Sequence, residues 1–238
     1  MLILSIECTA GPVSCALIED GKLKAELYLD VKTTHSQTLL PMCEQALNLC
    51  SKSVSDLDYI AVTEGPGSFT GVRIGVSAVK GLAEPLNIPC MPVSVLEAMA
   101  YNMLGQEVYV CAVMDARCNQ VYNALFKVNG EEVERLCDDR ALMIDELKAE
   151  LFELSVKDKR PIVVVGDGAE LFYGKANDIE VLKLAPMHLI RQKASGVGMV
   201  ALKHIEEGKT VTAEQLLPKY LRLPQAEREL KAKQALKG

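Results

Sequence analysis

Two acidic residues, each at the end of a short apolar stretch, are the side chains of this sequence best suited to chemistry. Glu7 follows the apolar residues 3–6, and Asp115 ends an apolar run that begins at Val108. Two carboxylates that face one cleft could bind magnesium or move a proton. Each could equally accept backbone hydrogen bonds inside its own turn. The sequence leaves both interpretations open.

Two glycine turns could bring the backbone close to an anion. Gly65-Pro66-Gly67-Ser68 follows an apolar stretch and precedes a helical pattern, in which Ser68 or Thr70 can cap the first turn. Gly166 and Gly168 follow a second apolar stretch. A strand, a turn and a helix N-terminus are the usual elements of a phosphate site, although a short glycine turn alone is weak evidence. The candidate residues of a nucleotide cleft are thus Glu7, Asp115, Gly166 and Gly168.

The three histidines do not form a recognisable metal site. His35, His188 and His204 lack the i, i+4 spacing that puts two ligands on one helical face. A GxSxG turn and a Ser/His/Asp arrangement of known spacing are also absent from the sequence, which disfavours a peptidase. His35 is suited to orienting a helix start, and His204 fits a surface position. We therefore expect no catalytic residue and no bound metal.

The candidate residues lie on a pattern that occurs twice along the chain. In each copy an apolar strand ends at the acidic residue, a turn follows, and the next two strands are joined by Asp20-Gly21 or Asn129-Gly130. Both dipeptides are strong hairpin signals. The duplication predicts an α/β fold of two lobes, each a mixed sheet covered by helices. We assign residues 1–104 to the first lobe and 105–238 to the second, with a closing helix from the C-terminal segment.

Two predicted helices of the first lobe have apolar or small-residue faces wider than packing on their own sheet would require. In the helix predicted over residues 39–50, apolar side chains cover about half of the cylinder, whereas a surface helix needs a stripe of only about 100°. In the helix that begins near Gly71, small residues flank an apolar line. Close packing on its own sheet or on a partner helix would explain this flank. The candidate partner surface comprises His35, Leu39, Met42, Ala46, Leu49, Gly71, Arg73, Gly75 and Ala78.

Composition limits the compartment and the partners. At 238 residues and 49% hydrophobic composition, the chain can bury a large core. No apolar run reaches the length of a membrane span, no signal peptide is evident, and the eight cysteines form no CxxC pair, so we expect a cytoplasmic protein with reduced cysteines. The net charge of -6 disfavours a broad nucleic-acid surface. A basic C-terminal stretch is the exception: Lys219, Arg222, Arg228, Lys231, Lys233 and Lys237.

The stretch 65–83 (GPGSFTGVRIGVSAVKGLA) resembles the signature of the TsaB (YeaZ) family, a bacterial subunit of the machinery that makes N6-threonylcarbamoyladenosine in tRNA. Supporting matches lie at 3–9 (ILSIECT), 35–41 (HSQTLLP), 114–117 (MDAR) and 218–222 (PKYLR). The resemblance implies the duplicated fold of actin, sugar kinases and Hsp70, the ASKHA fold, in which ATP normally lies between the lobes. ATPases of this fold usually have Asp-x-Gly in the first hairpin, whereas this chain has Glu7-Cys8-Thr9-Ala10-Gly11.

The same resemblance implies partners and a role. Members bind the catalytic TsaD subunit through the matching helices of the first lobe and can form homodimers without it; a small ATPase, TsaE, joins the assembly. Contact with tRNA is then made mainly by the complex, and any ATP or ADP belongs to it. TsaD uses an HxxxH pair to hold a metal, whereas this chain offers only His35 in that region. The implied function is a non-catalytic scaffold or activator; the alternative is a self-sufficient ASKHA-type ATPase or kinase.

Overall fold

The first lobe is built on a mixed five-stranded sheet. In the computed structural model, which describes residues 1–222, its strands are β1 (Leu2–Glu7), β2 (Val13–Glu19), β3 (Lys22–Leu29), β4 (Tyr59–Gly65) and β5 (Cys90–Ser94). The strand order is β3-β2-β1-β4-β5. The central strand β1 pairs antiparallel with β2 and parallel with β4. The strands on one side of β1 are therefore antiparallel, and those on the other side are parallel.

The second lobe repeats this topology. Its strands are β6 (Gln106–Asp115), β7 (Gln120–Gly130), β8 (Glu132–Arg135), β9 (Arg140–Met143), β10 (Ile162–Val165) and β11 (Leu182–Leu184). The order β8-β7-β6-β10-β11 matches that of the first sheet, with β6 antiparallel to β7 and parallel to β10. Strand β9 also pairs antiparallel with β7, at the start of that strand. The predicted duplication of an α/β unit is confirmed.

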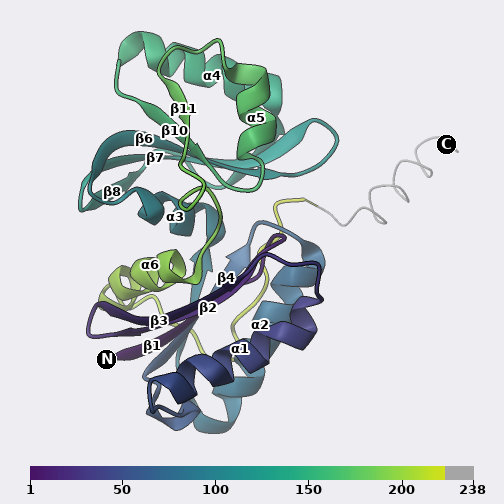
Figure 1. Ribbon diagram of the computed structural model, residues 1–238, viewed down its shortest axis with the longest axis vertical. Helices are drawn as coiled ribbons and strands as arrows, with labels where there is room; N and C mark the ends of the chain where they lie inside the picture. Colours follow the sequence, from purple (N-terminus) through teal and green to yellow (C-terminus); the bar gives the residue numbers. More distant parts are fainter. Residues whose placement is uncertain (223–238) are drawn as a thin grey trace, which may run out of the picture.

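Helices cover the outer faces of both sheets and fill the space between them (Figure 1). On the first lobe these are α1 (His35–Leu49) and α2 (Phe69–Ala83), and on the second α4 (Ile144–Lys157) and α5 (Ala169–Ala176). Between the sheets lie α3 (Val95–Ala100) and α6 (Ala194–Glu206). The 3-10 turns are η1 (Val54–Asp56), η2 (Glu84–Leu86) and η3 (Tyr101–Met103). Across residues 1–222, no helix has the length and apolar character needed to cross a membrane.

The two central helices are exchanged between the lobes. Helix α3 follows β5, yet its residues Leu96 and Met99 belong to the core of the second lobe. Helix α6 follows the second sheet, yet Val197 and Val200 pack against the first sheet. After α6 the chain stays with the first lobe, because Val211 bridges to Cys90 of β5. The assignment of everything after residue 104 to the second lobe is therefore wrong for residues 194–216, which pack on the first lobe.

Candidate functional site

The turn before α2 packs the helix directly onto the end of β1. Ser68 is the N-cap of α2, and its hydroxyl oxygen accepts a hydrogen bond from the Gly71 N–H at 3.3 Å, as predicted. A Cβ on Gly71 would overlap the carbonyl oxygen of Cys8, and one on Gly75 would lie 2.7 Å from the Cys8 sulfur. Both glycines are buried against their own sheet. The assignment of Gly71 and Gly75 to a partner interface is therefore wrong.

A cleft of about 510 Å³ opens between the carboxyl ends of β1 and β6. The first lobe lines it with residues 9–11 and 67–69, and the second lobe with residues 114–117 and Asp167. This position is the one expected for a nucleotide in a two-lobed fold, and Asp115 lies in it as predicted. The geometry of the individual carboxylates decides what the cleft can bind.

Glu7 does not line this cleft. Its side chain is only 1% exposed, and Oε1 accepts hydrogen bonds from the Thr9 N–H at 2.8 Å and the Thr9 hydroxyl at 2.7 Å. Burial raises the pKa of Glu7, while the Thr63 and Thr9 hydroxyls act in the opposite direction. Of the two roles open from the sequence, Glu7 therefore has the structural one: it organises its own turn.

Asp115 is also engaged within its own loop. Its carboxylate accepts the Arg117 N–H at 2.8 Å and pairs with the Arg117 guanidinium at 3.2 Å. The loop continues through Arg117, Cys118 and Asn119 with φ values of 63°, 54° and 57°, three successive residues in the left-handed region that non-glycine residues seldom adopt. The one arginine that lines the cleft is therefore already paired with a carboxylate.

Asp167 is the cleft residue that the sequence interpretation missed. It lies between Gly166 and Gly168, and its Oδ1 accepts a hydrogen bond from Gln192 Nε2 at 3.0 Å. Burial raises the pKa of Asp167, with a smaller contribution from the charge of Asp115. The two glycines are buried instead of lining the cleft: a Cβ on Gly166 would overlap the Val113 carbonyl oxygen, and one on Gly168 would lie 2.8 Å from the Asp115 nitrogen. They let α5 approach β6, so their assignment as nucleotide ligands is wrong.

The electrostatics of the cleft are unfavourable for a polyphosphate. Two aspartates face the cleft, and its arginine is held by one of them. A phosphate chain needs free cations or a bound metal to offset its charge. Within residues 1–222, no group of three or more His, Cys, Asp or Glu side chains is arranged to hold a metal ion. The cleft thus has the location of a nucleotide site, and the N-terminus of α2 lines it, but its Arg117 is already paired with Asp115.

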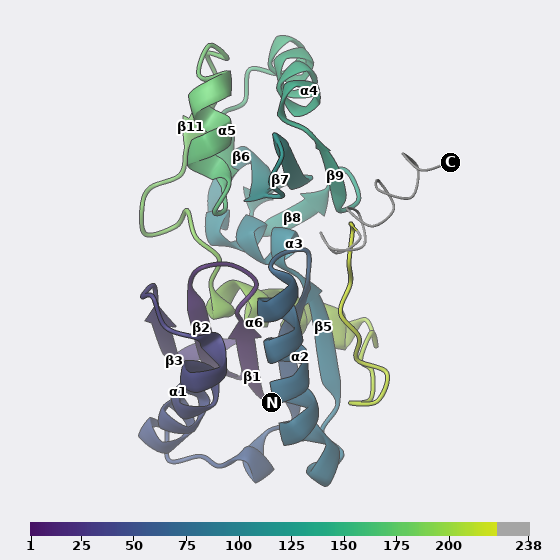
Figure 2. The same ribbon diagram turned by 90° about the vertical axis from the view of Figure 1, so that its right-hand side faces the viewer.

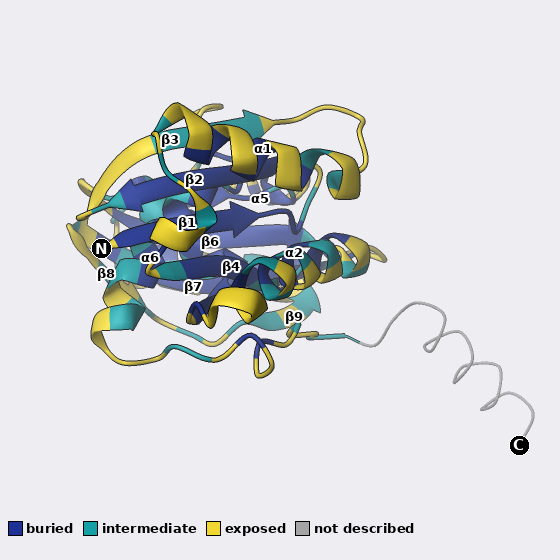
Figure 3. Cartoon of the chain, turned by 90° about the horizontal axis from the view of Figure 1, so that it is seen from below, coloured by how far each residue is buried: buried dark blue, intermediate teal, exposed yellow. Residues whose placement is uncertain are grey.

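The predicted partner face of α1 is divided between core and surface. Leu39, Met42 and Ala46 are buried under the helix in the core of the first lobe. The assignment of Met42 and Ala46 to a partner interface is wrong, because the sheet uses this side of the apolar face, whereas Leu39, although buried, also lines the hollow between α1 and α2. Leu49 is 71% exposed, and Leu40, which the sequence interpretation did not select, is 45% exposed. Figure 3 shows α1 dark on its inner side and yellow on its outer side.

Two adjoining hollows with both apolar and polar lining lie along α1 and α2. A groove of about 560 Å³ is lined by His35, Leu40, Arg73, Ile74 and Ala78 together with their neighbours. His35 Nε2 lies 2.8 Å from the Ala10 carbonyl oxygen, which fixes the ring at the helix start as expected. A second groove of about 540 Å³ along α1 shares Leu40 with the first. We call these two hollows together the α1–α2 groove.

The chain beyond α6 runs along the first lobe and reaches the second (Figure 2). The Tyr220 ring stacks on Phe69 at the start of α2, with 4.6 Å between centroids, and its hydroxyl accepts a hydrogen bond from Arg73 Nε at 2.8 Å. Arg222 then donates to the Ala116 carbonyl oxygen of the second lobe at 2.5 Å. The remaining basic residues, Arg228, Lys231, Lys233 and Lys237, lie outside the described residues.

An ion-pair network between the lobes includes His204, which the sequence interpretation placed on the surface. His204 is 16% exposed, and its Nε2 lies 3.4 Å from Glu97 Oε1. That interpretation was wrong because α6 is inserted between the lobes. Arg135 Nη2 lies 2.9 Å from Glu97 Oε2. Burial acts to raise the pKa of Glu97, but the hydrogen bonds from His204 and Arg135 outweigh burial and lower the pKa to about 2.

Glu97 should make the protein sensitive to acid. A carboxyl group with a lowered pKa in the folded state stabilises the fold above its unfolded-state pKa of 4.5, and this contribution is lost as the pH falls towards about 2. The difference between the unfolded-state and folded-state pKa of Glu97 corresponds to about 3 kcal/mol of the free energy of unfolding. In urea unfolding at a series of pH values, Glu97→Gln should remove this slope, whereas the exposed Glu153→Gln should retain it. Parallel pH profiles for the wild type and Glu97→Gln would contradict this assignment.

Two lobes of like topology, joined around a cleft at their strand ends, define the ASKHA class of fold. The solved structure of YeaZ from Pseudomonas aeruginosa superposes with a TM-score of 0.77 at 29% identity, covering 92% of this chain and 99% of that one. The family model of TsaD, a tRNA N6-adenosine threonylcarbamoyltransferase, matches residues 30–230.

Curated relatives define the family more narrowly. The tRNA threonylcarbamoyladenosine biosynthesis protein TsaB of Bacillus subtilis (strain 168) is 31% identical over 95% of this chain and 96% of its own length. The TsaB protein of Escherichia coli (strain K12) is 32% identical over 98% of this chain and 100% of its own length. The chain belongs to the TsaB (YeaZ) family.

Proposed function

We propose that the chain is a non-catalytic subunit of the machinery that forms N6-threonylcarbamoyladenosine in tRNA, and that it binds a TsaD-type catalytic subunit through the α1–α2 groove. The observation that carries this proposal is the exposure of apolar side chains along the groove, with Leu40 at the point where its two hollows meet. The centre of a protein interface is typically apolar and enriched in arginine and aromatic residues. Arg73 lines the groove and contacts Tyr220, whose ring stacks on Phe69, so residues of this kind lie beside it.

The shape of the partner follows from the family relationship, because the TsaD family model matches residues 30–230 of this chain. The catalytic subunit would then have the same fold and could present an equivalent two-helix face. A second copy of this chain offers that face too. We therefore infer that the free protein forms a homodimer through the α1–α2 groove and exchanges its second copy for the catalytic subunit.

The non-catalytic role follows from the chemistry of the interlobe cleft. Glu7 is buried and accepts hydrogen bonds from Thr9 in its own turn, outside the cleft lining, and Asp115 is paired with Arg117, which supports a role without catalysis at this cleft. In this proposal the chain has no resident cofactor. ATP or ADP, a TsaE-type ATPase and the tRNA engage the assembled complex, which would work in the cytoplasm.

The proposal is tested by placing a charge in the groove. Leu40→Glu should weaken association with the TsaD subunit of the same organism by about 30-fold or more, because the carboxylate would be desolvated in the interface. Modification of tRNA by the reconstituted complex should fall with it. The matched control is Leu171→Glu, at 43% exposure on α5 of the second lobe, which should leave both unchanged. Circular dichroism melts check that both variants are folded.

Three outcomes would contradict this function. Unchanged co-purification of Leu40→Glu with the catalytic subunit would exclude the α1–α2 groove as the interface. Modification of tRNA by this chain alone would exclude a non-catalytic role. Stoichiometric binding and turnover of ATP by the isolated chain would favour the alternative, a self-sufficient ASKHA-type ATPase or kinase.

A further inference from the structure

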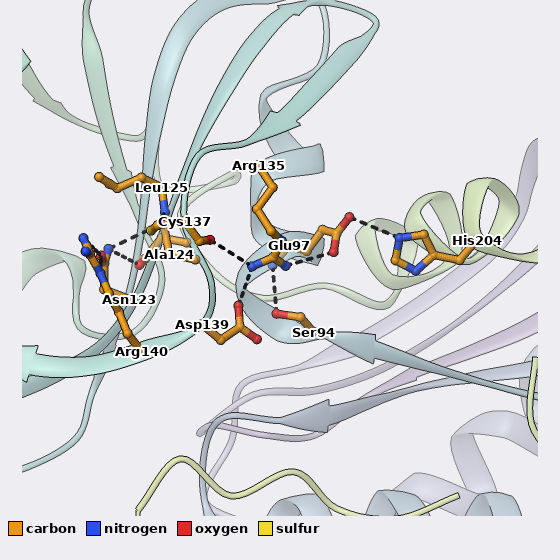
Figure 4. Close-up of polar contacts among 11 residues, drawn as sticks. Ser94, Glu97, Asn123, Ala124, Leu125, Arg135, Cys137, Asp139, Arg140 and His204 are labelled. Carbon is orange, nitrogen blue, oxygen red and sulfur yellow. Dashed lines mark hydrogen bonds and ion pairs between the residues drawn. The ribbon is translucent and has the colours of Figure 1, made fainter. Parts of the chain in front are cut away.

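A second interlobe cavity, of about 500 Å³, lies beside the Glu97 network and apart from the α1–α2 groove. The first lobe lines it at the ends of β4 and β5 with Glu64 and Ser94, and the second lobe lines it with residues of β8 and the loop that follows. Figure 4 shows part of its lining: Ser94, Glu97, Arg135, Asp139 and His204. The lining includes Glu64, Ser94, Glu97, Arg135, Asp139 and Lys219.

Arg135 is the centre of this network, and its charge is already committed. One end of its guanidinium pairs with Glu97 at 2.9 Å and the other with Asp139 Oδ1 at 2.6 Å. The Cζ atom of the Arg135 guanidinium also lies 4.7 Å from the centroid of the Phe126 ring, and this contact helps to hold the guanidinium in place. Glu97 contacts Arg135 through one carboxylate oxygen and His204 through the other. Within the network, Arg135 and Glu97 therefore satisfy each other.

Asp139 retains an unused oxygen. Its side chain is only 2% exposed, and Oδ2 has no hydrogen-bond partner among residues 1–222. Figure 4 shows this second oxygen turned away from Arg135. A buried carboxylate oxygen normally accepts at least one hydrogen bond, and leaving it without one is costly. Because Asp139 borders the cavity, a ligand there can supply the missing donor.

Glu64 provides a second carboxylate for the same ligand. Burial raises the pKa of Glu64; the charge of Lys219 lowers it and the charge of Asp139 raises it. No ion pair to the Glu64 side chain is found within the described part of the chain. The lining contains four carboxylates, including Asp138, against the cations of Arg135 and Lys219. The carboxylates of the cavity lining therefore outnumber its arginine and lysine side chains.

We propose that this cavity binds a small organic cation with a primary ammonium group, held between Asp139 Oδ2 and the Glu64 carboxylate. An ammonium carries one charge and three N–H donors, which fits two acceptors better than a cation without donors. A divalent metal fits less well, because within residues 1–222 no cluster of three or more His, Cys, Asp or Glu side chains is arranged to hold one. This inference does not depend on the proposed function.

The test is an NMR titration of the full-length chain at neutral pH and constant ionic strength. Methylammonium should produce saturable shifts at the amides of Glu64, Glu97 and Asp139, and tetramethylammonium, which has no N–H donor, should not. Glu64→Gln keeps the size of the side chain, removes its charge and breaks no ion pair of the described residues. It should weaken methylammonium binding by at least about tenfold.

A matched variant separates a site from general electrostatic attraction. Asp138 lines the same cavity but is exposed, so Asp138→Asn should change the affinity by less than about twofold. Asp139→Asn should weaken methylammonium binding at least as much as Glu64→Gln does, and a thermal melt checks its fold because it weakens the pair with Arg135. The proposal is overturned by equal shifts with tetramethylammonium, by saturation with Mg²⁺ but not methylammonium, or by undiminished binding in Glu64→Gln.

Discussion

Gly71→Ala should destabilise the protein by about 3 kcal/mol or more, because the added Cβ would overlap the Cys8 carbonyl oxygen. Relief would require α2 to move away from β1, which would open the core of the first lobe. The matched control lies in the same helix: a Cβ on Gly81 meets no atom within 4 Å. Gly81→Ala should therefore stabilise the protein by about 0.5 to 1 kcal/mol through its helix propensity. Chemical denaturation of the two variants measures the contrast.

This contrast decides what the glycines of α2 are for. If they served a partner helix, Gly71→Ala would leave the isolated chain stable and weaken only association. If they serve packing on β1, the isolated chain itself loses stability. Equal stability of Gly71→Ala and the wild type would contradict the packing described here. The same reasoning predicts that a bulky residue at Gly75, next to the Cys8 sulfur, would reduce monomer stability before it affected any partner.

Met42→Glu should unfold the first lobe, with a loss of several kcal/mol, because Met42 is 5% exposed and lies in the core between α1 and the sheet. Leu49→Glu, in the same helix at 71% exposure, should leave the melting temperature within a few degrees of the wild type. Thermal melts followed by circular dichroism compare the pair. A folded, stable Met42→Glu protein would show that α1 does not pack as described.

The two α1 variants also separate folding from association. Loss of partner binding by Met42→Glu would say nothing about the interface, since the α1–α2 groove would be lost with the fold. Leu40→Glu reports on the groove itself, because Leu40 is exposed and lines both of its hollows, whereas Leu49→Glu places a charge on the exposed side of α1 outside the groove lining. A groove variant that remains folded and no longer associates is the informative result.

Local features of the fold were predictable from the sequence because they depend on near neighbours along the chain. The Asp20-Gly21 turn has φ values of 50° and 74°, and Ser68 caps α2, both as their residue types predict. The repeated strand, acid, turn and hairpin pattern predicted two lobes of like topology, and their strand orders match. Near-neighbour sterics and hydrogen bonding largely determine such elements, so the sequence carried this information.

Tertiary structure alone decided which side of each element meets the rest of the molecule. The apolar arc of α1 contained both Leu39 and Leu40, and only the position of the sheet buries the first and exposes the second. Glu7 turned into its own loop, whereas Asp167 faced the cleft. His204 became part of an ion-pair network because α6 crosses back between the lobes. Burial and charge pairing depend on contacts between residues distant in sequence, and the periodicity of a single helix or strand does not predict those contacts.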